Sequence, residues 1–231
     1  HISLAIAYNI WLYWHNTQDI SFMKDYGLEM LLEIALFWES AAVYNPTTKR
    51  YDIDHVMGPD EFHESYPETK ESGLKNNAYT NMMVVWLFEE IARIKNEFST
   101  TDFATIQKKT GVNDQLLEKM DEIKRQLSLE IDNKGVIAQF DGYFELKDLD
   151  WQHYKQEYGN IYRMDRILNA EGKSADDYKV AKQADSLMIF YNFSKEQVST
   201  ILKDLDYQVP ADYVQKNLNY YLARTSHGST L

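Results

Sequence analysis

The sequence predicts an all-α protein whose helices pack in two layers. Apolar residues recur at i, i+3, i+4, i+7 and i+8 in several segments of the chain, which is the period of an amphipathic helix. Further apolar residues widen these stripes, and a helix with a wide apolar surface contacts protein on two sides. Residues that favour helix ends stand between the segments. These observations together favour helices packed against helices.

Three strongly amphipathic helices are predicted first along the chain, at residues 4–12, 28–36 and 84–92. Two later segments, residues 116–127 and 198–205, carry narrower apolar stripes and more charge, so we expect them to be outer helices. With weaker patterns included, we expect about seven or eight helices in all.

Polar residues and glycines indicate where helices begin and end. Side chains that can accept a backbone N–H are expected to cap helix starts at Asp19, Asn77, Asn113 and Ser194. Gly27 and Gly111 are expected to separate helices. Residues 47–75 and 133–160 lack a helical period and far exceed the ~4–6 residues of a typical connection, so they are predicted to be long loops of the functional or disordered kind.

Composition limits the classes of protein that the chain can form. Its 231 residues, 44% of them hydrophobic, suffice for one globular domain or a large part of one. A net charge of −12 disfavours binding to nucleic acid or to an anionic membrane, and no apolar run approaches the ~20 residues that span a bilayer. Cysteine is absent, which excludes disulfides and thiolate chemistry and is compatible with a reducing compartment. We therefore expect a soluble, cytoplasmic protein.

The stretch HVMGPDEFHE, residues 55–64, gathers carboxylates and histidines in the first long loop. Its Gly-Pro pair restricts the backbone and so aims the next side chains, which makes Glu61 a candidate general acid for protonating a leaving oxygen. Two other interpretations stay open: Asp60 and Glu61 cap the next element in solvent, or the loop binds a metal. The metal ligands would be His55, Asp60, His63 and Glu64, although their spacing matches no regular metal motif.

The last eight residues, RTSHGSTL at 224–231, combine an arginine, a histidine, hydroxyl side chains and a glycine, without a carboxylate. Hydroxyl groups and backbone amides donate hydrogen bonds to an oxyanion, and glycine permits close approach of the backbone. The stretch is therefore a candidate oxyanion site. An ordinary Ser/Thr capping segment explains the same residues, and both interpretations stay open.

Four motifs in register carry a family resemblance: GPDEFHE, NNAYTNMM, YKVAKQADSLM and RTSHGSTL. In this order and at these separations they resemble glycoside hydrolase family 65, the maltose, trehalose, kojibiose and nigerose phosphorylases. The resemblance runs from His1 to Leu231. Phe62 departs from the tyrosine common at its position, and PETKESGLK lengthens the loop before Asn76. These departures concern the identity of the substrate more than the family.

The resemblance implies a single catalytic (α/α)6 barrel domain over residues 1–231, incomplete in this chain. The N-terminal β-sandwich and C-terminal β domain of the family are expected to be absent from the chain. We therefore expect a fragment that is inactive alone. A homodimer of the full-length protein is compatible with the resemblance.

The resemblance also implies roles for individual residues. Glu61 matches the general acid, and Lys182 and Gln183 match the pair that contacts substrate hydroxyls. The residues that match the phosphate-binding segment are Thr225, His227, Gly228 and Ser229. His1 and Ser3 match positions near the acceptor sugar. An acid that must keep its proton benefits from burial and from acidic neighbours, here Asp60 and Glu64.

The implied activity is that of an inverting disaccharide phosphorylase. It would cleave an α-glucoside of the maltose, trehalose or kojibiose type with inorganic phosphate, giving β-glucose 1-phosphate and a sugar. Phosphate is the co-substrate, and no cofactor or metal is expected. A hydrolase of the same family, such as a trehalase-like enzyme, is the alternative, and it needs a general base about 6.5–9.5 Å from the acid. A non-catalytic sugar-binding helical unit is a further alternative.

Overall fold

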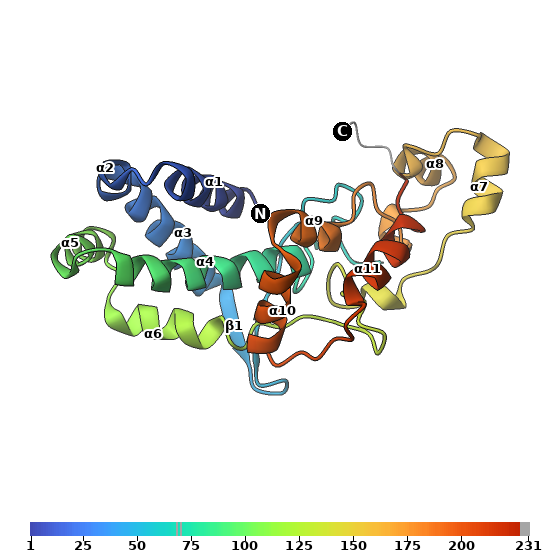
Figure 1. Ribbon diagram of the computed structural model, residues 1–231. Coiled ribbons are helices and arrows are strands. Elements are labelled where there is room, and N and C mark those ends of the chain that lie inside the picture. Colours follow the sequence, from blue (N-terminus) through green and yellow to red (C-terminus); the bar gives the residue numbers. More distant parts are fainter. Residues whose placement is uncertain (68, 70, 227–231) are drawn as a thin grey trace. The chain divides into compact units, whose positions relative to one another are not determined.

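The computed structural model describes residues 1–67, 69 and 71–226, and Figure 1 shows its helices and strands. The all-α prediction is confirmed: the described residues form eleven α-helices and one two-stranded sheet, with short π and 3-10 turns. Helices α2, α7, α8 and α9 have eight residues or fewer, too short to show a period, which is why about seven or eight helices were predicted. Among the described helices, none has both the length and the apolar character needed to cross a membrane.

The chain divides into two compact units, and each is assembled from stretches that are distant in sequence. The first unit contains His1–Ile53, Thr80–Ser128 and Asp204–Asp206. The second unit contains Asp54–Tyr79, Leu129–Lys203 and Tyr207–Leu231. Because neither unit is a continuous stretch, no linker or composition change marks the division in the sequence.

The first unit contains the predicted amphipathic helices and a hairpin. Its helices are α1 (Ile2–Thr17), α2 (Ile20–Phe22), α3 (Leu28–Ala41), most of α4 (Ala78–Glu97), α5 (Thr100–Thr110) and α6 (Asp114–Ile123). Strands β1 (Ala42–Asn45) and β2 (Arg50–Ile53) pair antiparallel, with Ala42 opposite Ile53 and Asn45 opposite Arg50. The predicted N-caps Asp19 and Asn113 are confirmed, since their side chains accept the N–H groups of Phe22 and Leu116.

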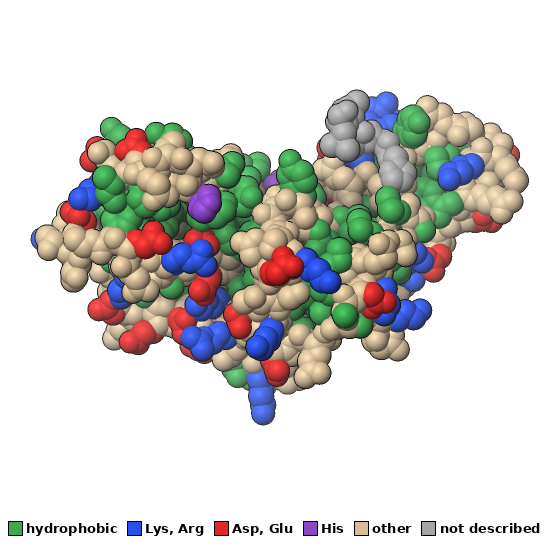
Figure 2. All heavy atoms as spheres, in the orientation of Figure 1, with side chains coloured by type: hydrophobic (Ala, Val, Ile, Leu, Met, Phe, Trp, Pro, Cys, Tyr) green, Lys and Arg blue, Asp and Glu red, His purple; other side chains and the backbone are tan. Residues whose placement is uncertain are grey.

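In α1 and α3, burial follows the predicted stripes on one face only. Leu4, Ala7 and Ile10 of α1 are buried, and each such side chain of Leu or Ile size contributes about 1.5–3 kcal/mol. On the other face, Ile6 and Phe37 are 41% and 57% exposed. Figure 2 shows hydrophobic side chains, in green, at the surface over the region where Figure 1 places α1. The burial on both faces that was predicted for these helices is present in α4, where Val84, Val85, Trp86, Leu87 and Phe88 are all buried, but not in α1 and α3 within the described residues.

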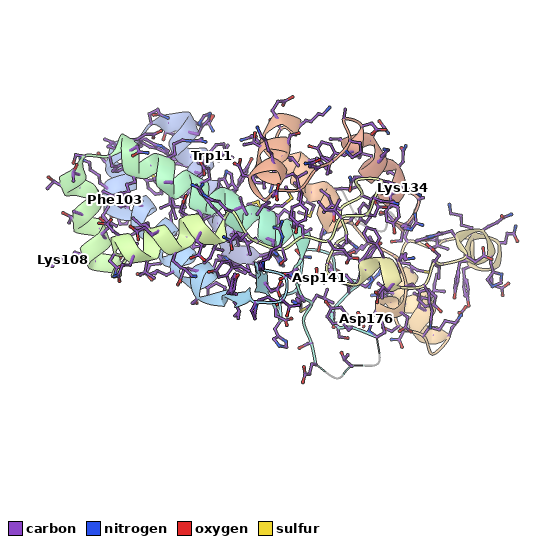
Figure 3. The ribbon with its side chains drawn as sticks, turned by 90° about the horizontal axis from the view of Figure 1, so that it is seen from below. Trp11, Phe103, Lys108, Lys134, Asp141 and Asp176 are labelled. Atoms are coloured by element: carbon purple, nitrogen blue, oxygen red, sulfur yellow. The ribbon has the colours of Figure 1, made fainter. Side chains whose placement is uncertain are left out.

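The aromatic residues of the first unit fill its core in part. Trp11, labelled in Figure 3, lies 5.8 Å from the ring of Trp86 and stacks on His15 at 5.0 Å. Its indole N–H donates to the buried carboxylate of Glu90 over 3.0 Å. These aromatic side chains therefore pack α1 against α4.

The prediction that Gly27 separates two helices is wrong. The backbone continues through a π-helical turn, Met23–Gly27, directly into α3. Gly27 has helical φ and ψ, and a Cβ there would lie 3.1 Å from the Phe22 ring and 3.4 Å from Ile10, beside the sulfur of Met23. The glycine provides space for packing. Gly111 does end α5, in the left-handed conformation at φ 77°.

The second unit holds the remaining helices. They are α7 (Trp151–Tyr158), α8 (Met164–Ala170), α9 (Asp185–Asn192), α10 (Lys195–Asp204), of which Asp204 belongs to the first unit, and α11 (Tyr213–Leu222). One apolar cluster forms around Phe140, Tyr143 and Tyr221, and another around Phe62, Met164 and Val180. Residues 133–160 are not one long loop, as had been predicted, because they include α7. The Asp150 carboxylate caps this helix by accepting the N–H of His153 over 3.0 Å.

Candidate active site

Residues of two distant motifs and of the loop at residue 147 meet in the second unit through short parallel bridges. Ala181 pairs with Thr225: the Ala181 N–H donates to the carbonyl of Arg224 over 2.9 Å, and the Ser226 N–H donates to the carbonyl of Ala181 over 2.8 Å. On the other side, Tyr178 pairs with Lys147. The segment that precedes Lys182 is thus held between the loop at residue 147 and the start of the RTSHGSTL stretch.

The GPDE turn is packed against the first turn of α9. A Cβ on Gly58 would overlap the Asp185 carboxylate and the amide of Asn77, so only glycine fits at this position. Asn77, expected to cap α4, lies directly before that helix, and its side-chain amide donates to Asp185 Oδ2 over 2.9 Å. Glycine is therefore required at position 58 because these two side chains leave no space for a Cβ.

Two buried aspartates connect this turn to the KQAD segment. The backbone N–H of Asp60 donates to Asp185 Oδ1 over 2.6 Å. In turn, Asp60 Oδ1 accepts the N–H groups of Phe62 and of Lys182, each over 3.2 Å. Asp60 and Asp185 are 4% and 3% exposed.

Burial raises the pKa of both carboxyl groups. The pKa of Asp60 lies well above its usual range because burial penalises the charged form and because the Asp185 carboxylate is adjacent. Burial also raises the pKa of Asp185, to about 7, although hydrogen bonds from Asn77 and from the Asp60 N–H oppose the rise. Both Asp185 oxygens accept hydrogen bonds, so we assign the proton of the pair to Asp60.

Glu61 lies beside Lys182, a residue of a second motif. The Lys182 Nζ is 2.8 Å from Glu61 Oε2, and the side chains are 16% and 63% exposed, respectively. We expected the acid itself to be buried among carboxylates. The buried carboxyl is instead that of Asp60, because the turn directs the Asp60 side chain inward and the Glu61 side chain outward.

Gln183 and the start of the RTSHGSTL stretch are also part of this arrangement. The Gln183 side chain donates to the carbonyl of Pro59 over 3.3 Å. Thr225 donates its hydroxyl proton to the carbonyl of Tyr221 over 2.7 Å, so the same hydroxyl cannot donate to phosphate without rotating. His227, Gly228 and Ser229 lie outside the described residues.

Arg224 is held rigidly at the beginning of that stretch. Its guanidinium lies 3.9 Å from the centre of the Tyr220 ring and forms an ion pair with Asp148 over 2.9 Å. Lys179 reaches the same carboxylate over 3.4 Å. The positive charge of Arg224 is therefore partly compensated by Asp148.

The histidines of the HVMGPDEFHE stretch do not converge on a shared point. His63 is buried, its Nε2 lies 2.9 Å from the carbonyl of Tyr178, and burial lowers its pKa. His55 is exposed, and the Glu64 N–H donates to Asp176, the residue labelled in Figure 3. Within the described part of the chain, no group of three or more His, Asp or Glu side chains is arranged to hold a metal ion.

His1 and Ser3 belong to the first unit. His1 precedes α1 and is exposed, and the Ser3 hydroxyl accepts a hydrogen bond from the Trp38 indole over 3.1 Å. The residues described above around Glu61 all belong to the second unit.

Sequence reasoning missed three residues of this site. Asp185 and Asn77 stand inside the KQAD and NNAY motifs, but only the fold shows that both contact the GPDE turn. Arg163 lies near enough to Glu61 for that carboxylate to contribute to the rise in the pKa of Arg163, after the larger effect of its ion pair with Asp165. No periodicity or motif in the sequence indicated Arg163.

The chain is similar to known glycosyl hydrolases along its whole length. The profile of the glycosyl hydrolase family 65 central catalytic domain matches residues 1–231. The trehalose 6-phosphate phosphorylase of Lactococcus lactis is 44% identical over 230 residues, and the kojibiose phosphorylase of Halothermothrix orenii is 33% identical over 238 residues. Each alignment covers all of this chain, which spans 28% and 27% of the two relatives.

A solved structure has the same fold. The chain matches a candidate kojibiose phosphorylase from the human microbiome with a TM-score of 0.75 and 28% identity, over 98% of this chain and 30% of the other. This match confirms the predicted fold class, a portion of an (α/α)6 barrel. The family match identifies the chain as part of a glycosyl hydrolase catalytic domain. More narrowly, the chain belongs to glycosyl hydrolase family 65.

Proposed function

We propose that the protein containing this chain is an inverting α-glucoside phosphorylase with Glu61 as its general acid. The observation that carries the proposal is the 2.8 Å contact between Glu61 and Lys182, residues 121 positions apart in two separate motifs. The contact supports the proposal because it brings the Glu61 carboxyl group and a lysine cation together at one partly open position of a family 65 domain. Similarity to a trehalose 6-phosphate phosphorylase and to a kojibiose phosphorylase supports phosphorolysis.

The proposed reaction is a single displacement. An oxygen of inorganic phosphate attacks the anomeric carbon while the bond from that carbon to the bridging oxygen breaks. The proton of Glu61 passes to the bridging oxygen, which leaves as a hydroxyl of the released sugar. The products are β-glucose 1-phosphate and that sugar, and Glu61 recovers its proton from solvent. Phosphate is already anionic, so it requires positioning and charge compensation instead of a general base.

We propose two residues for the contacts to substrate hydroxyls, Lys182 and Gln183. In the described structure Lys182 contacts Glu61, and a bound substrate would compete for the same ammonium group. His227, Gly228 and Ser229, with Thr225, are proposed to bind phosphate, and His1 and Ser3 are proposed to lie toward the acceptor sugar. These roles rest on the motif match.

The substrate is proposed to be a trehalose-type disaccharide, with its 6-phosphate as the first to be tested. The relative at 44% identity is a trehalose 6-phosphate phosphorylase, whereas the kojibiose and nigerose phosphorylases are 31–33% identical. Maltose and kojibiose are the remaining candidates. We further propose that residues 1–231 are part of one barrel domain in a cytoplasmic protein that forms homodimers.

Phosphate dependence of the rate tests the proposal. The full-length enzyme is incubated with trehalose 6-phosphate, trehalose, maltose or kojibiose, and the initial rate of sugar release is measured against phosphate concentration. We expect a saturable dependence and formation of β-glucose 1-phosphate with one substrate. A rate that is constant from zero phosphate upward would identify a hydrolase instead. Calorimetric binding of sugar without any turnover would identify a sugar-binding unit.

A further inference from the structure

Asp60 is the buried neighbour of the proposed general acid, and its contacts reach both motifs of the site. Its Oδ1 accepts the N–H of Phe62, which closes the turn around Glu61. The same oxygen accepts the N–H of Lys182, which fixes the backbone that carries the lysine side chain. One oxygen atom therefore holds the backbone at both ends of the ion pair between Glu61 and Lys182.

The backbone of Asp60 is fixed as firmly as its side chain. Its N–H donates to Asp185 Oδ1 over 2.6 Å, and Asp185 is in turn held by Asn77 and by the hydrogen bond from its own N–H to Gln139 over 2.8 Å. All of these groups are buried. The position of the Glu61 turn is thus determined by a connected polar network within the second unit, not by solvent-exposed contacts.

Asp60 itself is unsuited to act on a substrate. It is 4% exposed, and Oδ2, its second oxygen, is buried without a hydrogen-bond partner in the described part of the chain. An unpartnered buried oxygen costs about 1–3 kcal/mol, so an aspartate here is poor for stability alone. The presence of aspartate despite this cost in stability fits a role in which its other oxygen, Oδ1, must accept two N–H groups at once.

We propose that Asp60 is a positioning residue that sets the distance and direction between the general acid Glu61 and the substrate-binding Lys182. The proposal rests on the proposed phosphorylase function. Asp60 acts by accepting backbone hydrogen bonds through Oδ1, and its negative charge is not required. A neutral side chain with an oxygen at the same position performs the same task, and a side chain of similar shape without that oxygen does not.

Two substitutions in the full-length enzyme separate these properties. Asp60→Asn retains an acceptor oxygen, whereas Asp60→Leu retains the approximate shape and removes the acceptor. Asp176→Asn is the matched control, because Asp176 also accepts backbone N–H groups from this loop, at Glu64 and Ser65, but contacts neither Glu61 nor Lys182. Each variant is assayed with the disaccharide and with α-glucosyl fluoride, whose leaving group needs no proton.

We expect Asp60→Leu to lower kcat on the disaccharide about 100-fold or more, which is within the ~10²–10⁴ contributed by acid catalysis. Its loss on α-glucosyl fluoride should be below about tenfold, because that reaction does not depend on the aim of Glu61. Asp60→Asn and Asp176→Asn should both retain disaccharide turnover within about tenfold of the wild type. If Asp60 had a purely structural role, Asp60→Leu would lower the turnover of both substrates by the same factor.

Several results would overturn the proposal. Equal losses of Asp60→Leu on both substrates, or an unchanged kcat, would show that Asp60 does not aim the acid. A folded Asp60→Asn enzyme that loses disaccharide turnover as strongly as Asp60→Leu would show that the charge matters and not the acceptor. If Asp60→Leu shows no cooperative melting transition, Asp60→Ala takes its place, and the Asp60→Asn result remains decisive alone. A wild-type enzyme without phosphate-dependent turnover defeats the proposed function, and a normal wild type beside an unaffected Asp60→Leu variant defeats only the positioning role.

Discussion

The backbone N–H of Asp60 lies 2.6 Å from the carboxylate of Asp185, a residue 125 positions later in the chain. This hydrogen bond joins the GPDE turn to the KQAD segment and brings two carboxyl side chains into one buried place. Two carboxylates so close in a low-dielectric interior repel each other, so the pair keeps a proton at neutral pH. The consequences can be measured in stability as well as in turnover.

The stability of the protein should fall as pH rises through the range in which this pair loses its proton. An unfolded aspartate titrates near pH 4, whereas the folded pKa of Asp185 is about 7 and that of Asp60 is also raised. Between these values the folded state binds more protons than the unfolded state, and stability then decreases with increasing pH. Asp60→Asn removes one carboxyl, so the melting temperature of the variant relative to wild type should rise by about 2 °C or more between pH 5 and pH 8.

Asp176→Asn is again the control for this measurement, since Asp176, in the turn Ala175–Asp177, contacts the loop of Asp60 and its carboxylate accepts several hydrogen bonds. Its melting temperature relative to wild type should not rise over the same pH range. A difference between Asp60→Asn and wild type that stays constant from pH 5 to pH 8 would contradict a shared buried proton.

Gly58→Ala should destabilise the enzyme and impair the site together. The added Cβ would overlap Asp185 and Asn77, which hold the turn, so one of these groups must move. Overpacking of this kind costs about 1–3 kcal/mol. Differential scanning calorimetry and kcat on the disaccharide are the two measurements. Gly111→Ala, at an open position with positive φ, controls for glycine loss without steric overlap, and it should lower stability but leave kcat unchanged.

Glu61→Gln should abolish turnover of unactivated disaccharides, because the amide retains the shape of the acid but cannot supply its proton. The expected loss is ~10²–10⁴ in kcat. α-Glucosyl fluoride should be affected much less, since fluoride leaves without protonation. Steady-state rates on both substrates decide the matter, and an equal loss on both would remove Glu61 from the acid role.

His227→Ala combined with Ser229→Ala should weaken phosphate binding while leaving disaccharide binding nearly unchanged. Each donor lost to a charged oxyanion removes about 1.5–3 kcal/mol, so the phosphate KM should rise at least about a hundredfold. Initial rates against phosphate at saturating disaccharide provide the measurement. If the phosphate KM of the double variant equals that of the wild type, these residues are not the phosphate site, although the activity itself would stand.

Much of the helical fold could be predicted because its signals are local. The stripes that form α1, α3 and α4 repeat over several turns, and the caps Asp19 and Asn113 act on N–H groups only three residues away. Gly27 was misread because the same residue type serves for a helix end and for close packing. Its role depends on the Phe22 and Ile10 side chains beside it, which no local pattern reports.

The sequence by itself determined the helical class, the family and the motif residues of the candidate site, since these depend on residue types and spacings along the chain. Only the tertiary structure decided that Asp60 is buried while Glu61 is exposed, and that Asp185, Asn77 and Lys182 hold and face the GPDE turn. The physical reason is that burial and pKa depend on groups brought together from distant positions. Neighbouring carboxylates in a motif have the same chemistry, and the direction in which the folded backbone points each one assigns them different roles.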